Sequence, residues 1–414
     1  MRSQVVDAYT TSLQPPARIF DRWLAARLQR AIAPAAVRLE LWDGSSPYSR
    51  DMSPIGSVLV HDRAALIGLI VDPDLWFGDA YTAGRLDISG DLGTVVEALT
   101  RATLGTPTWR ERVRGALERP NSFTHARRNV HHHYDLGNEF YQQWLDQDLV
   151  YTCAYFEDPQ MSLEAAQHAK FDLVCRKLRL QPGESVVEAG CGWGTLALHM
   201  ARKYGVHVKA FNVSREQLAY ARDRARREGM TERVQFIDDD YRNVRGEFDA
   251  FVSVGMLEHV GLHHYQSLSD VLRRAVRRGG RGLLHFIGRD APRPLNAWTR
   301  RRIFPGAYAP TLAEVATRVL APSGMSIVDV ENLRLHYART LAHWRARFKH
   351  AEEQIRARYG ANFERAWELY LAGSQAAFST GWMQLFQVVF VPLETAPPYW
   401  TRAEMYAESP KWAG

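Results

Sequence analysis

The stretch VVEAGCGWGTLALHM, residues 186–200, decides the fold. An apolar run ends in an acid, Glu188, and three glycines follow at alternate positions: Gly190, Gly192 and Gly194. An apolar-periodic segment then begins at Thr195, so the pattern predicts a strand, a tight turn and a helix. Glycine lets the backbone approach a ligand closely, and a helix start directs free N–H groups at it. The stretch therefore predicts a site for a nucleotide-like cofactor.

Strand and helix patterns alternate along the chain after this stretch. Apolar runs predict strands at 185–188, 206–213, 234–238, 248–254 and 282–287, with two further strands at 325–330 and 385–391. Periodic segments predict helices at 195–203, 216–228 and 264–276, the last ending at a Gly279-Gly280 cap, and more helices from about 340 to 379. This alternation is typical of an α/β fold with a parallel sheet covered on both faces.

Composition and charge limit the classes of protein. The 414 residues are 46% hydrophobic and 24% charged, which suits a globular chain of two domains. No run approaches about 18 consecutive apolar residues, and the first residues lack the apolar core of a secretory signal. The three cysteines form neither a disulfide framework nor a zinc spacing, so we expect a cytoplasmic protein.

The chain is basic, with a formal charge of +6, and 46 of its 52 basic residues are arginine. A basic surface can attract nucleic acid or anionic lipid. Charge alone favours the simpler interpretation of a solvated, arginine-rich surface.

Residues 1–105 predict a smaller α+β domain. A helix is expected over Arg18–Ala33, with an apolar stripe at Phe20, Trp23, Leu24, Leu28 and Ile32. Strands are expected at 37–42 and 57–60, and residues 72–99 end in an apolar helix. Residues 106–130 predict a linker, and 131–414 a second domain. The helix stripe either packs on its own domain or lies in a membrane interface.

Two features limit which cofactor the site can bind. The loop spacing is G-x-G-x-G rather than the G-x-G-x-x-G of dinucleotide folds, and Asn212 stands where such folds place an acid. Both disfavour a dehydrogenase. Asp238-Asp239-Asp240-Tyr241 closes the third strand. Adenine can stack on the Tyr241 ring there and hydrogen-bond to a neighbouring acid, or the acids form a solvated loop.

Other groups suggest chemistry at strand ends. Glu258 and His259 follow the fourth strand and His285 lies in the fifth, so they predict a buried site with coupled titrations, or core packing. His131–His133 are consecutive and point to opposite faces of an extended chain, so no metal is expected. A dense run of aromatic residues is either core or a pocket for a cation: Tyr134, Phe140, Tyr141, Trp144, Tyr151, Tyr155 and Phe156.

Several motifs occur in a specific order: HYDLGNEFY, YTCAYF, GCGWG, SREQ, DYR, SVGMLEHVG, LLHFIG, IFPG and the tail from Tyr337 to Leu371. Over about residues 70–395 the chain resembles the cyclopropane-fatty-acid synthase family of S-adenosylmethionine (SAM)-dependent enzymes. The resemblance implies a class I methyltransferase fold, with a Rossmann-like seven-stranded sheet, helices on both faces and acyl-binding helical insertions. The length and the separate N-terminal domain resemble the branch that acts on phospholipids.

The resemblance also implies site residues. The cofactor residues are Tyr151, Glu188, Gly190, Cys191, Gly192, Gly194, Asn212, Gln217, Asp240, Tyr241 and Arg242. A bicarbonate ion serves as the base in the family, and its ligands match Cys153, Glu258, His285, the Ile287 backbone and Tyr337. Because Glu258 is itself an anion, we expect it to orient His285 or to share a proton with the bicarbonate.

The implied reaction is methylene transfer to the cis double bond of an unsaturated acyl chain in a membrane phospholipid. It passes through a carbocation and bicarbonate-assisted deprotonation, and forms a cyclopropane ring. The enzyme is expected to lie peripherally on the inner face of the membrane, with no nucleic-acid partner and with a homodimer left open.

The chain departs from the family at Glu188, Asn212-Val213-Ser214 and IFPGAYAPT, which indicates a divergent subgroup. The alternatives are a methyl- or methylene-branched acyl product, or methylation of a soluble small molecule. A non-catalytic lipid-binding protein is disfavoured because Cys153, Glu258, His285 and Tyr337 are all retained.

Overall fold

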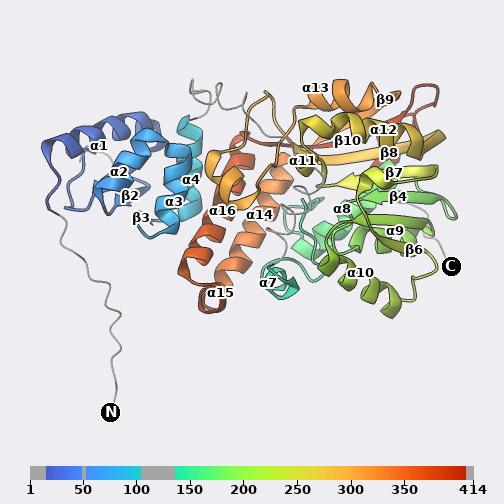
Figure 1. The fold of residues 1–414 in the computed structure, drawn as a ribbon, viewed down its shortest axis with the longest axis horizontal. Coiled ribbons are helices and arrows are strands. Elements are labelled where there is room, and N and C mark those ends of the chain that lie inside the picture. Colours follow the sequence, from blue (N-terminus) through green and yellow to red (C-terminus); the bar gives the residue numbers. More distant parts are fainter. Residues whose placement is uncertain (1–14, 49–52, 104–135, 407–414) are drawn as a thin grey trace, which may run out of the picture.

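The computed structural model describes residues 15–48, 53–103 and 136–406. The elements form a three-stranded sheet near the N-terminus and a seven-stranded sheet. Figure 1 shows an elongated molecule with the small sheet at one end and the large sheet at the other. The long helices α14 (Arg334–His350) and α16 (Ala361–Thr380) lie between them.

The large sheet confirms the predicted α/β class. Its strands are β4 (Ser185–Ala189), β5 (His207–Asn212), β6 (Val234–Asp238), β7 (Phe248–Val254), β8 (Val276–Gly288), β9 (Met325–Asn332) and β10 (Gln384–Pro392). Their order is β6-β5-β4-β7-β8-β10-β9. The first five strands run parallel, and β10 is antiparallel to both of its neighbours.

Helices cover both faces of this sheet. Adjacent strand residues point to opposite faces, so Val186 and Val187 belong to two different apolar clusters. The cluster around Val186 includes α8 (Leu163–Lys177), α9 (Thr195–Tyr204) and α10 (Arg215–Arg227). The cluster around Val187 includes α12 (Tyr265–Ala275). Burial on both faces explains why the central strands β4 and β7 are near-continuous apolar runs.

The predicted cap at Gly279-Gly280 is wrong. Helix α12 ends at Ala275, where the Val276 N–H still bonds to the Leu272 carbonyl, and both glycines lie inside β8. The pairing of β8 with β7 is interrupted between Phe248 and Ala250, and Gly279 has a φ of 78°. The glycine therefore serves a bulge at the start of the strand rather than a helix end.

The N-terminal unit, meaning the described residues between 15 and 103, carries the small sheet. Its elements are α1 (Ile19–Ile32), β1 (Val37–Leu41), β2 (Gly56–Val60), α2 (Arg63–Val71), α3 (Pro73–Thr82), β3 (Leu86–Ser89) and α4 (Leu92–Thr103). The helices α2 and α3 were not predicted individually. The domain boundary near residue 105 stays a prediction, and the predicted linker at 106–130 lies outside the described residues.

The N-terminal unit packs directly on α16 through α3 and α4. One apolar cluster continues from Val37 of β1 to Leu371 of α16. Three ion pairs cross the same boundary: Arg302–Asp79, Arg345–Asp91 and Arg365–Asp87. The unit is thus positioned against the helices that border the site. None of the helices in the described ranges is long and apolar enough to cross a membrane.

Candidate active site

Two cavities lie side by side at the carboxyl ends of the parallel strands. The smaller has a volume of about 180 Å³ and the larger about 470 Å³. Tyr151, Thr152, Gly255 and His259 line both cavities, so they form a shared wall. A ligand in one cavity therefore lies next to a ligand in the other.

The smaller cavity collects the predicted cofactor residues. Its lining includes all of them except Gly194: Tyr151, Glu188, Gly190, Cys191, Gly192, Asn212, Gln217, Asp240, Tyr241 and Arg242. Gly194 begins α9 with a φ of 82°, and a Cβ atom there would lie 2.5 Å from Cζ of Phe236. Gly194 therefore allows α9 to pack against β6, which supports the loop without lining the cavity.

One part of the smaller cavity carries a buried acid and a buried base. Oε2 of Glu188 is buried and has no hydrogen-bond partner among the described residues. Burial raises the pKa of Glu188 to about 8, opposed by the charge of Lys170. Burial also lowers the pKa of Lys170 to about 8, and its Nζ donates to Oγ1 of Thr152 at 2.8 Å. A ligand group with both an ammonium and a carboxylate complements this pair.

At the next strand ends, side chains hold the loops that shape the smaller cavity. Nδ2 of Asn212 donates to the Gly192 carbonyl at 3.1 Å and to Oε1 of Gln217 at 2.9 Å. The Arg242 guanidinium donates to both carboxylate oxygens of Asp240, each at 2.8 Å. The Asn212 contact connects the end of β5 to the glycine loop, and the Asp240–Arg242 pair fixes the turn after β6.

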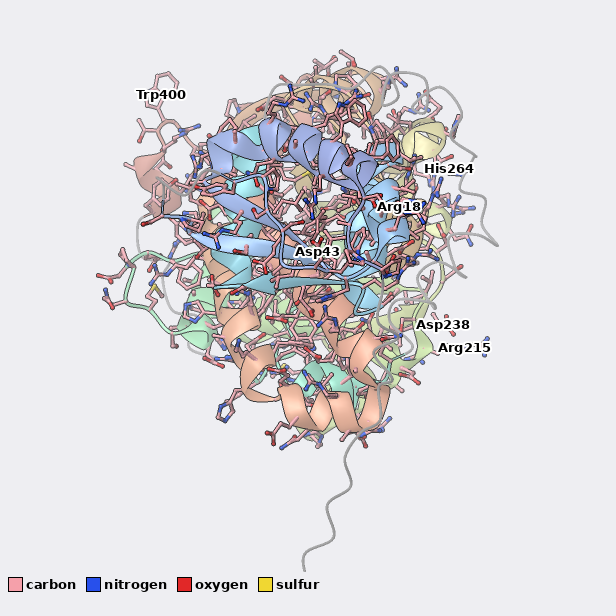
Figure 2. The ribbon with its side chains drawn as sticks, turned by 90° about the vertical axis from the view of Figure 1, so that its left-hand side faces the viewer. Arg18, Asp43, Arg215, Asp238, His264 and Trp400 are labelled. Atoms are coloured by element: carbon pink, nitrogen blue, oxygen red, sulfur yellow. The ribbon has the colours of Figure 1, made fainter. Side chains whose placement is uncertain are left out.

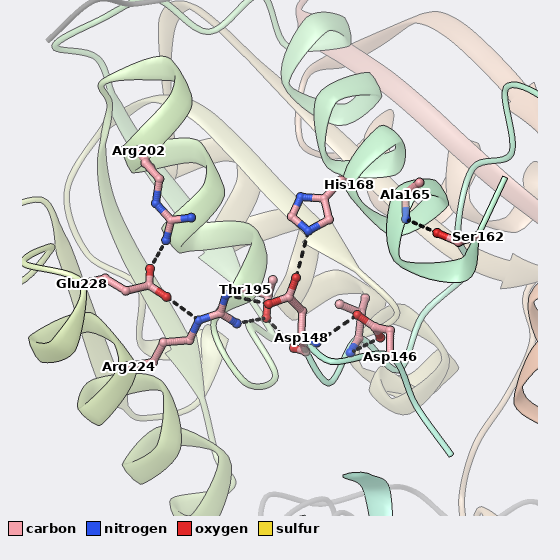
Figure 3. A network of polar contacts seen from close by, with 10 residues as sticks. Asp146, Asp148, Ser162, Ala165, His168, Thr195, Arg202, Arg224 and Glu228 are labelled. Atoms are coloured by element: carbon pink, nitrogen blue, oxygen red, sulfur yellow. Dashed lines mark hydrogen bonds and ion pairs between the residues drawn. The ribbon is translucent and has the colours of Figure 1, made fainter. Parts of the chain in front are cut away.

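A polar network fixes the segment that leads to the shared wall (Figure 3). The Asp148 carboxylate accepts a hydrogen bond from Arg224 of α10 at 2.7 Å. The main-chain carbonyl of Asp148 accepts one from Oγ1 of Thr195 at 2.8 Å. The carboxylate also lies 2.9 Å from Nε2 of His168 on α8. Leu149, the next residue, has a φ of 55°, which costs a side-chain-bearing residue energy. Three helices thus hold Tyr151 and Thr152 in place.

The larger cavity is mostly apolar and is assembled from distant parts of the chain. Leu28 and Ile32 of α1 line it at the N-terminal unit, and Leu385 of β10 lines it at the large sheet. Its phenylalanine, tyrosine and tryptophan lining is Phe77, Tyr151, Trp298, Phe304, Tyr308, Tyr337, Tyr370, Phe378 and Trp382. The volume lies within the range of small-molecule sites, and this lining suits a hydrocarbon chain.

The five predicted base-site residues all line the larger cavity: Cys153, Glu258, His285, Ile287 and Tyr337. Oε1 of Glu258 accepts the Ile287 N–H at 2.5 Å, whereas its buried Oε2 has no partner among the described residues. Burial raises the pKa of Glu258 to about 7. Its carboxyl group is therefore able to gain or lose a proton near neutral pH.

Gln387 of β10, rather than Glu258, holds the His285 ring. Nδ1 of His285 lies 3.0 Å from Nε2 of Gln387. Burial, together with the charges of Lys170 and Lys177, keeps the pKa of His285 well below its usual value. Nε2 of His285 is buried and unpartnered among the described residues. Burial also raises the pKa of the Cys153 thiol, which stays protonated.

Of the described members of the predicted aromatic pocket for a cation, Tyr151 alone lines the cavities. Phe140, Tyr141 and Trp144 are fully buried in an aromatic cluster, where Phe140 lies edge-on to Trp367. Tyr134 and His131–His133 lie outside the described residues. Within the described ranges, no group of three histidine, cysteine or acidic side chains is arranged to hold a metal ion.

Sequence reasoning missed Lys170 and Gln387. Both had a signal: the chain has six lysines, two of which fall in the apolar helix α8, and Gln387 interrupts the apolar run of β10. A polar residue inside an otherwise buried element needs a partner.

The fold and the smaller cavity define a SAM-dependent methyltransferase. The lining of the smaller cavity suits the chemistry of SAM, because it holds the aromatic ring of Tyr241 and a buried acid and base, Glu188 and Lys170, that complement a zwitterion. A solved structure supports the assignment: mycolic acid cyclopropane synthase CmaA1 complexed with SAH and CTAB is 28% identical, with a TM-score of 0.61. The match covers 64% of this chain and 97% of that one.

Sequence comparisons give the family. Residues 121–388 match the family model for mycolic acid cyclopropane synthetase. The chain is 37% identical over 391 residues to "Probable fatty acid methyltransferase" of Pseudomonas putida, covering 89% of this chain and 96% of the relative. It is 38% identical over 259 residues to cyclopropane-fatty-acyl-phospholipid synthase of Escherichia coli, covering 62% of this chain and 66% of the relative. The chain belongs to the cyclopropane synthase family and is a SAM-dependent C-methyltransferase.

Proposed function

We propose that this enzyme transfers a methylene group from SAM to the cis double bond of an unsaturated acyl chain in a membrane phospholipid, forming a cyclopropane ring. The observation that carries the proposal is the shared wall between the two cavities. A polar cavity for a charged cofactor lies against an apolar cavity for a hydrocarbon, with Tyr151, Thr152, Gly255 and His259 between them.

The side chains suit a reaction in which a neutral alkene becomes a cation. SAM supplies an electrophilic methyl group on a sulfonium. The protein must hold the double bond beside this group and keep water away. The aromatic face of Tyr151 stabilises nearby positive charge, and its hydroxyl lies 2.8 Å from that of Tyr370, which restrains the ring.

We also propose that the base site holds a bicarbonate ion, which supplies an acceptor for the proton lost before ring closure. Nε2 of His285 provides a group for the anion, and Oε2 of Glu258 can share a proton with it. The Cys153 thiol lies in the same lining, and it donates to the Ala154 carbonyl at 3.1 Å. The Ile287 N–H already bonds to Glu258. The Ile287 N–H can bind the anion only when Glu258 no longer accepts its hydrogen bond.

The alternative is a methyl- or methylene-branched product from the same first step. The similarity to a protein named as a fatty acid methyltransferase favours keeping this alternative. The carbon that loses the proton decides between the products, so the position of the base relative to the double bond sets the outcome.

The test incubates the purified full-length protein with SAM and vesicles of a cis-monounsaturated phospholipid, followed by mass spectrometry of the acyl chains. We expect a gain of one CH₂ unit and no remaining double bond. A branched chain would replace the ring assignment by the alternative. Unchanged acyl chains, with turnover of a soluble acceptor, would overturn both acyl-chain proposals.

We further propose that α1 docks on the membrane. The structure divides the predicted apolar stripe: Leu24 is buried and Leu28 and Ile32 line the larger cavity, whereas Phe20 and Trp23 are 60% and 51% exposed. Arg22, Arg27 and Arg30 are exposed on the same helix. An apolar edge beside arginines suits an anionic lipid surface, and the same helix leads to the larger cavity.

A matched pair of tryptophans tests this docking. Figure 2 looks onto the N-terminal unit, and Trp400, which is 95% exposed, projects from a different part of the surface. We expect Trp23→Ser to weaken binding to anionic phospholipid vesicles by about 10-fold, because it removes a large apolar contact, and Trp400→Ser to leave it unchanged. Equal losses, or no loss for Trp23→Ser, would contradict docking through α1.

A further inference from the structure

A chain of buried polar side chains that do not line the larger cavity reaches His285. Gln387 pairs with His285 in register across the antiparallel strands β10 and β8. The Gln387 side chain continues to Lys177 of α8, whose Nζ lies 2.8 Å from its Oε1. Lys177 has a side-chain exposure of 0%, and its Nζ also donates to Oε2 of Glu331 at 2.5 Å.

Lys177 decides how the Gln387 amide is oriented. The oxygen and nitrogen of a glutamine side chain are assigned from their hydrogen-bond partners. An ammonium group can only donate, so the atom that faces Lys177 must be the amide oxygen. The NH₂ group of Gln387 must then face His285, which agrees with the 3.0 Å distance between Nε2 of Gln387 and Nδ1 of His285.

This orientation has a consequence for the imidazole. Nδ1 of His285 must accept the hydrogen bond from Gln387, so it carries no proton. A neutral imidazole then carries its proton on Nε2, the atom that is buried and unpartnered among the described residues. His285 itself is 3% exposed and lines the larger cavity.

The charges around the chain are consistent with a neutral ring and a charged lysine. Burial and the nearby Lys170 and Lys177 disfavour a proton on both nitrogens and keep the pKa of His285 low. Burial also lowers the pKa of Lys177, but Glu331 and Asp329 oppose this change, with Asp329 3.9 Å from Nζ. The ammonium form of Lys177 therefore keeps two counter-charges.

We propose that Lys177 and Gln387 are positioning residues that lock His285 in the tautomer with its proton on Nε2, so that the ring presents a hydrogen-bond donor to the larger cavity. His285 then holds an anion or an oxygen atom and does not take up the proton released in the reaction. The use of that donor rests on the proposed function, whereas the tautomer does not.

The direct test is nitrogen NMR of the full-length protein labelled with ¹⁵N-histidine. The His285 signals are assigned by their loss in His285→Gln. We expect a protonated, pyrrole-like Nε2 and an unprotonated, pyridine-like Nδ1. A proton on Nδ1, or signals averaged between the two tautomers, would overturn the proposal whatever the substrate proves to be.

Gln387→Glu tests the relay with nearly the same shape. A carboxylate accepts from both Lys177 and His285, so the proton moves to Nδ1 and the donor at Nε2 is lost. We expect kcat to fall by about 100-fold, with the affinity for S-adenosylhomocysteine retained. An unprotonated Nδ1 in Gln387→Glu, or normal kcat with the proton on Nδ1 alone, would contradict the relay.

Glu331→Gln serves as a control at the far end of the chain. It removes one counter-charge from Lys177 and leaves the Lys177–Gln387–His285 contacts in place. We expect the wild-type tautomer in this variant. A change of tautomer here as large as in Gln387→Glu would show that general loss of packing, rather than the amide of Gln387, controls His285.

Discussion

The two cavities differ in polarity, although burial raises the pKa of one carboxyl group in each, Glu188 in the smaller and Glu258 in the larger. The smaller cavity keeps charged side chains in its wall, including Lys170 and the Asp240–Arg242 pair. In the larger cavity, next to the shared wall, burial holds His285 neutral and raises the pKa of Glu258 to about 7. In the proposed function a charged reactant lies on one side and a hydrocarbon on the other. The difference teaches that, on this proposal, the reaction is controlled where the cavities meet.

The largest effect is expected where a proton must be shared in the apolar cavity. Glu258→Gln keeps a hydrogen-bond acceptor for the Ile287 N–H but cannot exchange a proton. We expect turnover to fall by about 1,000-fold, with binding of S-adenosylhomocysteine by calorimetry unchanged. His285→Ala should show the same separation. If the variants lost cofactor affinity but kept normal turnover at saturation, the assignment of Glu258 and His285 to the base site would be contradicted.

Filling the larger cavity should affect the lipid and spare the cofactor. Gly373 of α16 lines this cavity, and a Cβ atom there meets nothing within 4 Å. We expect Gly373→Leu to lower kcat/KM for the phospholipid by about 10- to 100-fold, with cofactor affinity retained.

The matched control is Gly373→Ala, which leaves most of the cavity open. It should raise the free energy of unfolding by about 1 kcal/mol, because alanine favours a helix over glycine. Unaltered lipid kinetics in Gly373→Leu would contradict the assignment of this cavity to the acyl chain.

Binding of a ligand in the smaller cavity should release a proton from Glu188. Glu188 has a raised pKa of about 8, so it is mostly protonated at neutral pH in the free protein. A bound ammonium group favours the carboxylate and lowers this pKa, so the ligand should displace a proton. Affinity for S-adenosylhomocysteine should therefore rise between about pH 6 and about pH 8.

Calorimetry in buffers of different ionisation enthalpy measures that proton directly. Glu188→Gln should bind S-adenosylhomocysteine about 10-fold more weakly and lose the dependence on buffer. Proton release that persists in Glu188→Gln would assign it to another group, and equal affinity would remove Glu188 from the ammonium site.

The smaller cavity was largely predictable because its residues follow consecutive strand ends. In a parallel sheet these ends meet at one edge, so Glu188, Asn212 and Tyr241 could be grouped before their positions were known. Gly194 was the exception, because a glycine needed for helix packing and one that faces a ligand share the same pattern. The strands β4, β7 and β10 were predictable because their apolar runs are buried on both faces.

The larger cavity was much less predictable. Its wall joins Leu28 of α1 to Leu385 of β10, and periodicity shows which face of an element is buried but not what covers it. The aromatic run before residue 156 was the visible feature, yet most of it is core. Gln387, which contacts His285, lies on β10, and Lys177, which contacts Gln387, lies on α8. These contacts depend on tertiary packing alone.

The central claim is that the shared wall lets a SAM methyl group reach an acyl double bond. The most direct measurement uses SAM labelled with ¹³C in its methyl group, vesicles of a cis-monounsaturated phospholipid, and carbon NMR of the extracted acyl chains. The account predicts the label in a ring CH₂ group, and predicts that Gly373→Leu suppresses it. Label confined to a head group or to a soluble acceptor would contradict the account.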